Sequence, residues 1–189
     1  MLNLIIFGSP GAGKGTQAKL IAKKYKLTHI SSGDILRQEL KNGALGKKIK
    51  SYQDAGKLVP DSLIIKMIET AITKKIKSHG FIFDGYPRNL KQAKALDKFF
   101  KNHRKNLDLV LNLKLSESED LKRIILRGLN SGRSDDNLKT IRSRFRVYQT
   151  QTTPILTYYN NQKKVITIDG RPKIEDVFQN INQKLLLEK

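Results

Sequence analysis

The sequence predicts an α/β fold, a three-layer αβα sandwich in which a five-stranded parallel sheet lies between two layers of helices. Two observations carry this prediction. Short apolar runs alternate along the chain with longer segments of helical periodicity, and strands separated by helices favour a doubly wound parallel sheet. The first apolar run, residues 2–7, also leads directly into a glycine-rich loop and then into a helical pattern. Ligands bind such sheets at the carboxyl ends of strands, where this loop lies.

The strands are expected at five apolar runs, of which the second is the weakest: residues 2–7, 28–31, 81–83, 109–115 and 165–168. Helical periodicity covers most of the chain between them, at residues 14–25, 62–77, 90–100, 117–129 and 137–159, and a final helix follows Pro172. Ser116 and Glu119 have the spacing of a capping box for the helix at 117–129. Pro154 is expected to kink the long helix at 137–159, because proline lacks the N–H that a helix interior requires.

Two segments interrupt this alternation. Residues 31–60 contain short helical pieces but no convincing strand, and residues 128–138 form a polar loop rich in turn residues. Both are expected near the mouth of the ligand site, where movable covers are commonly found.

The composition sets limits on the function. The 189 residues suit a single domain, and the absence of cysteine excludes disulfides and thiolate metal sites and favours a reducing compartment, the cytoplasm. We expect no membrane span, since no apolar run approaches ~18 residues. We also expect no signal peptide, because the N-terminus lacks the charged region, apolar stretch and cleavage site of one, and its apolar run is a strand. The net charge of +20 raises the possibility of nucleic-acid binding, but the lysines are scattered and no recognised module is present. We therefore expect only weak, salt-sensitive, nonspecific binding.

The glycine-rich loop has the features of a phosphate cradle. Gly8, Gly13 and Lys14 form a GxxxxGK core between the first strand and the first helix. In such a loop backbone N–H groups surround phosphate oxygens, the helix N-terminus adds its positive dipole end, and the lysine reaches the terminal phosphates. The position after the lysine is usually Ser or Thr, which ligates the metal, but here it is Gly15, with Thr16 next. Binding of Mg²⁺ through water is therefore favoured over direct ligation by the loop.

A second motif, DGYPR at residues 84–88, follows a buried strand. Asp84 is placed to hold Mg²⁺ or its waters, with a simple turn at Gly85 as the alternative. Arg88 follows in a position to pair with phosphate, for which guanidinium is well suited. Earlier in the chain, Ser32 or Asp34 could cap a helix, and Arg37 could be a surface charge.

Several arginines gather late in the chain. Arg123 and Arg127 are four positions apart and so share a helix face, and Arg133, Arg142 and Arg144 follow. Solvated surface charge is one reading of each residue. The alternative is a cluster that neutralises a transferring phosphoryl group, whose charge is spread over three oxygens.

Four motifs occur in the same order as in a known family. The loop GSPGAGKGT, the segment SSGDILR at 31–37, DGYPR at 84–88 and SGRSDDN at 131–137 resemble the nucleoside monophosphate kinases, above all the short-lid adenylate kinases. The resemblance covers essentially the full length and implies a single P-loop kinase domain, with an AMP-binding insertion at 31–60 and a short lid at 128–138. It implies transfer of the γ-phosphoryl group of Mg·ATP to AMP, giving two ADP. It further implies Mg²⁺ with the nucleotide, no structural zinc, ATP, AMP and ADP as partners, and a cytoplasmic monomer.

The resemblance also implies roles for individual residues. The ATP site would comprise Gly11, Ala12, Gly13, Lys14, Gly15, Thr16, Arg123, Arg127 and Arg171. The AMP site would comprise Ser32, Arg37, Lys57, Leu58, Val59, Gly85, Arg88, Gln92, Arg133 and Arg144. Lys14, Arg88, Arg123, Arg133 and Arg144 would act on the transferring group, and Asp84 would hold the metal through water.

The nearest alternative is a UMP/CMP kinase. Gln92 lies four residues after Arg88, where adenylate kinases carry a glutamine, and an amide can pair with adenine through both a donor and an acceptor. Gln92 and Ser32 favour AMP, whereas Asn89 leans towards the UMP/CMP kinases. A GTPase is disfavoured because the DxxG and NKxD motifs are missing, and a dehydrogenase because GxGxxG is not met. The three histidines, at positions 29, 79 and 103, are interpreted as structural or exposed.

Overall fold

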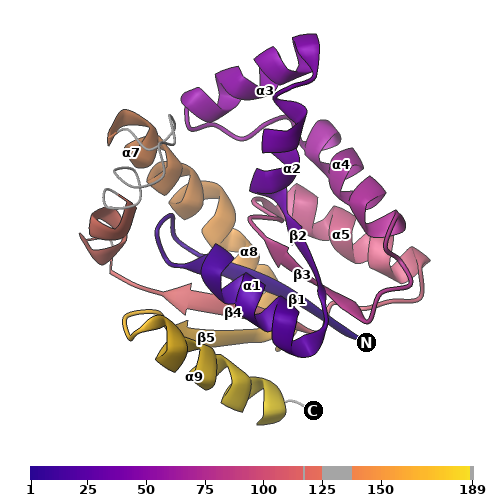
Figure 1. Ribbon diagram of the computed structural model, residues 1–189, viewed down its shortest axis with the longest axis vertical. Coiled ribbons are helices and arrows are strands. Elements are labelled where there is room, and N and C mark those ends of the chain that lie inside the picture. Colours follow the sequence, from indigo (N-terminus) through magenta and orange to yellow (C-terminus); the bar gives the residue numbers. More distant parts are fainter. Residues whose placement is uncertain (117, 125–137, 188–189) are drawn as a thin grey trace.

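The computed structural model describes residues 1–116, 118–124 and 138–187 (Figure 1). Five strands form one sheet in the order β2-β3-β1-β4-β5, and every neighbouring pair is parallel. The strands are β1 (Leu2–Gly8), β2 (Thr28–Ser31), β3 (Gly80–Asp84), β4 (Leu109–Lys114) and β5 (Val165–Asp169). The predicted fold class is therefore confirmed, including the short second strand, which pairs with β3 at the edge of the sheet.

Helices cover both faces of the sheet, so β1 is buried on both sides. Leu4 and Ile6 pack with α1 (Lys14–Tyr25) and α9 (Ile174–Leu187) on one face. Ile5 and Phe7 face the other core, which is built with α4 (Asp61–Thr73), α5 (Leu90–Asn102) and α8 (Thr153–Asn160) (Figure 1). Side chains alternate along a strand, so the unbroken apolar run of β1 supplies both cores.

Residues 31–60 form two short helices, α2 (Ser32–Glu39) and α3 (Gly43–Asp54), which rise beyond the carboxyl edge of the sheet (Figure 1). Asp34 N–H donates to Ser31 Oγ at 3.2 Å, so Ser31, and not Ser32 or Asp34, caps α2. That residues 31–60 act as a separate insertion stays a prediction. The predicted lid at 128–138 lies outside the described residues apart from its last position.

The helices around that loop differ in detail from the prediction. Residues 118–124 are helical, and Glu119 N–H donates to Ser116 Oγ at 3.4 Å, as the capping box predicts. The long helix expected at 137–159 consists of α7 (Leu138–Val147), the π-helical turn η1 (Tyr148–Thr152) and α8. The interruption lies directly before Pro154, whose ring would clash with the carbonyl group of Thr150 in a regular helix. Across the described ranges, no helix has the length and apolar character needed to cross a membrane.

Candidate active site

The phosphate loop joins β1 to α1 at the centre of the sheet's carboxyl edge. Gly11 and Gly13 have φ angles of +95° and +82°, which glycine adopts without strain. A Cβ atom on Gly11 would lie 2.5 Å from the main-chain oxygen of Asp120, so only glycine fits there. Among the described residues no side chain caps α1 at Gly13. The first N–H groups of the helix are thus directed at the loop, as anion binding requires.

Lys14, the first residue of α1, folds back over this loop. Its ammonium group donates to the main-chain oxygens of Gly8 at 2.8 Å and Ser9 at 2.7 Å. Ser9 O also accepts from Ala12 N–H at 3.1 Å, which closes the turn. The lysine is therefore held beside the amides that would surround a phosphate.

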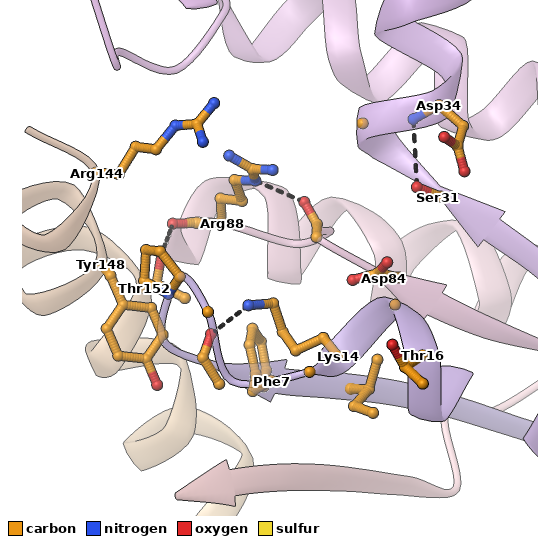
Figure 2. Close-up of a pocket in the computed structure, with 18 of the residues that line it drawn as sticks. Phe7, Lys14, Thr16, Ser31, Asp34, Asp84, Arg88, Arg144, Tyr148 and Thr152 are labelled. Carbon is orange, nitrogen blue, oxygen red and sulfur yellow. Dashed lines mark hydrogen bonds between the residues drawn. The ribbon is translucent and has the colours of Figure 1, made fainter. Parts of the chain in front are cut away.

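A cleft of about 730 Å³ opens above the loop. It is lined by the loop, the end of β2, the segment after β3, and α7 with η1. Figure 2 shows the side chains of Arg88 and Arg144 directed towards the same space, with Lys14 below them and Asp84 and Thr16 to one side. The structure thus places most of the predicted site residues on one cavity, namely Gly11, Gly13, Lys14, Gly15, Thr16, Arg37, Leu58, Asp84, Gly85, Arg88, Arg123 and Arg144.

Asp84 ends β3 next to the start of α1. Burial raises the pKa of its carboxyl group, but the neighbouring His29 and the charges of Lys14 and Arg88 outweigh burial, so the pKa is lowered overall. His29 Nε2 lies 3.9 Å from Asp84 Oδ2, beyond direct hydrogen-bond distance. A Cβ atom on Gly15 would lie 3.2 Å from the same oxygen. An ionised carboxylate beside the phosphate loop, with the Thr16 hydroxyl nearby, is an oxygen donor set that fits a hydrated Mg²⁺ ion.

Arg88 is held by two hydrogen bonds of its main chain and one of its side chain. Its N–H donates to Gln92 Oε1 at 2.7 Å, its carbonyl oxygen accepts from Thr152 Oγ1 at 2.9 Å, and its own Nε donates to Gly85 O at 2.8 Å. Ser32 Oγ donates to the same Gly85 oxygen at 2.6 Å. The exposed guanidinium group is thereby fixed at the cleft before any phosphate binds.

Two further arginines are engaged with other groups. Arg37 pairs with Asp34 at the mouth of the cleft, where both side chains are partly exposed. Arg123 donates to the main-chain oxygens of Gly170 at 3.0 Å and Arg171 at 3.1 Å, and to the Glu119 carboxylate at 3.1 Å. Helix 118–124 is thus connected to the turn that follows β5.

Comparison with known proteins decides the family. A family model described as adenylate kinase matches residues 6–164. The adenylate kinase of Parabacteroides distasonis is 49% identical over 97% of both chains, and that of Bacteroides thetaiotaomicron 45% over 96% of both. The chain belongs to the adenylate kinase family. Its reaction is accordingly that of the family, ATP:AMP phosphotransfer, and the UMP/CMP kinase alternative is not favoured.

Within the described part of the chain, some of the predicted site residues do not line the cleft. Ala12, Ser32, Val59 and Gln92 are buried, whereas Lys57 and Arg171 are exposed outside it. Gln92 is 2% exposed, and its Nε2 donates to Asp61 Oδ1 at 2.7 Å while its Oε1 holds Arg88. Arg171 donates to Asp169 and, through these hydrogen bonds, lowers the pKa of that carboxyl group to about 2. Arg127 and Arg133 lie outside the described residues. The roles of all these residues stay predictions.

Several residues that line the cleft were not predicted from the sequence, among them His29, Tyr148 and Thr152. None of these three belongs to a motif. Burial raises the pKa of Tyr148 to about 12, and the charge of Asp120 contributes to the same shift, so the phenol is neutral at physiological pH. Only the packing of η1 against the DGYPR segment reveals that Thr152 contacts Arg88.

Proposed function

We propose that ATP binds along the phosphate loop, that AMP binds between α2 and the DGYPR segment, and that the γ-phosphoryl group passes between them inside this cleft. One observation carries the proposal: cations from three separate elements, Lys14, Arg88 and Arg144, line one cavity. A transferring phosphoryl group distributes its charge over three oxygens, so fixed cations around it lower the barrier. Positioning and charge neutralisation are sufficient, and no general base is proposed.

On the donor side, the amides of Gly11 to Thr16 and the Lys14 ammonium group hold the triphosphate. Lys14 exchanges the carbonyl oxygens of Gly8 and Ser9 for phosphate oxygens, which carry more negative charge. Arg123, which already contacts the turn at Gly170, lies beside the adenine of ATP, and Arg127 and the Arg171 turn support it.

On the acceptor side, Arg37 and Arg88 hold the AMP phosphate. Arg37 leaves Asp34 to do so, and its partial exposure makes this exchange inexpensive. Ser32 and Gly85 shape the sugar-phosphate subsite, and the residues Lys57, Leu58 and Val59 line the base pocket. Gln92 reads the adenine edge, which requires its amide to leave Asp61.

Arg133 and Arg144 neutralise the moving phosphoryl group when the short lid, residues 128–138, closes over the cleft. Closure also excludes water, which would otherwise accept the phosphoryl group. Asp84 holds Mg²⁺ through water, supported by its lowered pKa. The ion supplies positive charge at the donor phosphates. We further propose a cytoplasmic location, on the basis of the absence of cysteine, and no specific nucleic-acid binding, on the basis of the scattered lysines. A monomer is proposed from the family resemblance alone.

An acceptor panel tests the proposal. ADP formation from ATP and Mg²⁺ is measured with AMP, CMP, UMP and GMP in turn, and the product balance is determined for each. We expect AMP to give the highest kcat/KM and two ADP for each ATP consumed. A preference for CMP or UMP would contradict the proposed base pocket. Release of free phosphate from ATP in place of phosphorylation of the acceptor would contradict the proposed water exclusion.

A further inference from the structure

A buried carboxyl group that the proposed reaction does not use lies behind the phosphate loop. Asp120, in helix 118–124, is 1% exposed. Its Oδ2 accepts a hydrogen bond from Ser9 Oγ, across 111 positions of sequence. Its Oδ1 is buried and has no hydrogen-bond partner within the described ranges.

This arrangement is unfavourable for folding alone. A buried carboxyl group with an unpaired oxygen costs free energy that an apolar side chain of similar size would avoid. The groups around Asp120 act in opposite directions. The charges of Lys14 and Arg123 favour the ionised carboxylate, whereas the charge of Glu119 disfavours it, as burial also does. The charge of Asp120 in turn acts on the Tyr148 phenol. A carboxyl group at such a position points to a task other than packing.

The partner of Asp120 occupies the central position in the loop. Ser9 O accepts both from Ala12 N–H and from the Lys14 ammonium group. The helix contacts the loop at a second point as well, where the Asp120 main-chain oxygen closes the space beside Gly11. Three residues further on, Arg123 binds the turn after β5. Helix 118–124 therefore connects the phosphate loop with that turn.

We propose that Asp120 is a positioning residue for ATP: by fixing the Ser9 hydroxyl group it holds the turn that Ser9 O and Ala12 N–H close, and with it the loop amides, in the arrangement that receives the triphosphate. The inference rests on the proposed binding of ATP along this loop. The acceptor side is reached through α2 and the DGYPR segment, so AMP binding is independent of this link.

The test compares Ser9→Ala, Asp120→Ala, the double variant and Asp120→Asn, with KM measured separately for ATP and AMP. Loss of one ordinary hydrogen bond predicts that each alanine variant raises KM for ATP about five- to tenfold. KM for AMP should stay within about twofold. The double variant should be no worse than the poorer single variant, because both remove the same link. Asp120→Asn should restore KM for ATP, because an amide oxygen also accepts from Ser9.

Ser118→Ala is the matched control, since Ser118 is exposed on the same helix. Three outcomes would each overturn the inference. These are equal changes in KM for ATP and KM for AMP, effects on KM for ATP that multiply in the double variant, and an unchanged KM for ATP in Ser9→Ala. Thermal melts verify folding, and if Asp120→Ala does not fold, Ser9→Ala decides, since it removes the same bond from the loop side. Absence of ATP:AMP turnover in the unaltered protein would instead contradict the proposed function.

Discussion

Thr152 Oγ1 donates a hydrogen bond to the main-chain oxygen of Arg88 at 2.9 Å, although the two residues are 64 positions apart. Thr152 is buried in the π-helical turn η1, and the peptide nitrogen of Arg88 is held from the other side by Gln92. The position of Arg88, which we propose binds the acceptor phosphate, therefore depends on the two elements α5 and η1.

Thr152→Val should weaken this support while conserving side-chain shape. The part-buried Arg88 carbonyl would lose its Thr152 donor, which predicts a fall of about tenfold in kcat/KM for AMP. KM for ATP should change little, because the phosphate loop is not involved. Thr150→Val is the control, since Thr150 is exposed and its hydroxyl bonds only within the helix, to Arg146 O. Equal effects of the two variants in steady-state kinetics would contradict the role of Thr152.

Arg88→Ala should lower kcat/KM by ~10²-fold or more, because a charged contact in a water-excluded site carries a few kcal/mol. Arg142→Ala provides a comparison, since Arg142 is exposed on α7 and does not line the cleft. Near-normal turnover of Arg88→Ala, or an equal loss in Arg142→Ala, would refute the assignment of Arg88 to the phosphate.

Gln92→Leu should narrow the preference for AMP over CMP and UMP, because the base would lose an amide that offers both a donor and an acceptor. Its absolute activity should fall too, since Gln92 also supports Arg88. The ratio of kcat/KM values between acceptors is therefore the diagnostic quantity. Asp61→Ala, which removes the acceptor of the Gln92 Nε2 group but leaves the amide, should keep the preference. Unchanged selectivity in Gln92→Leu would show that another group reads the base.

Asp120 should make the free energy of unfolding fall as pH rises. Burial raises the pKa of its carboxyl group, and the Ser9 hydrogen bond and the charges of Lys14 and Arg123 only partly oppose this. The folded state therefore binds more protons than the unfolded state from about pH 4 upwards, so stability decreases through that window as the proton is lost.

Asp120→Asn removes this titration. The unfolding free energy of the variant should therefore rise relative to that of the unaltered protein as pH rises from about 4 to 7. Urea denaturation at a series of pH values measures it. Asp169→Asn is the control: the pKa of Asp169 is lowered to about 2, so the corresponding difference should be flat over that range. A flat difference for Asp120→Asn as well would contradict the raised pKa.

Local patterns were sufficient for the sheet and the phosphate loop. The strand positions follow from apolar runs, and the loop follows from glycines placed directly after β1. The interruption before Pro154 was also predictable, because the proline itself lacks the required donor, although its form as a π-helical turn was not. The cap of α2 was assigned to the wrong residues, since Ser31, Ser32 and Asp34 all have suitable side chains and only the backbone angles select Ser31.

The sequence by itself determined the chemistry of this protein, because a glycine loop with a lysine and the DGYPR segment act through residues close together in the chain. Tertiary structure alone decided which polar side chains support them. Ser9 meets Asp120, and Arg88 meets Thr152, through the packing of elements far apart in sequence. Hydrophobic periodicity does not predict such contacts, because it indicates which face of a helix is buried but not which polar atom that face contacts.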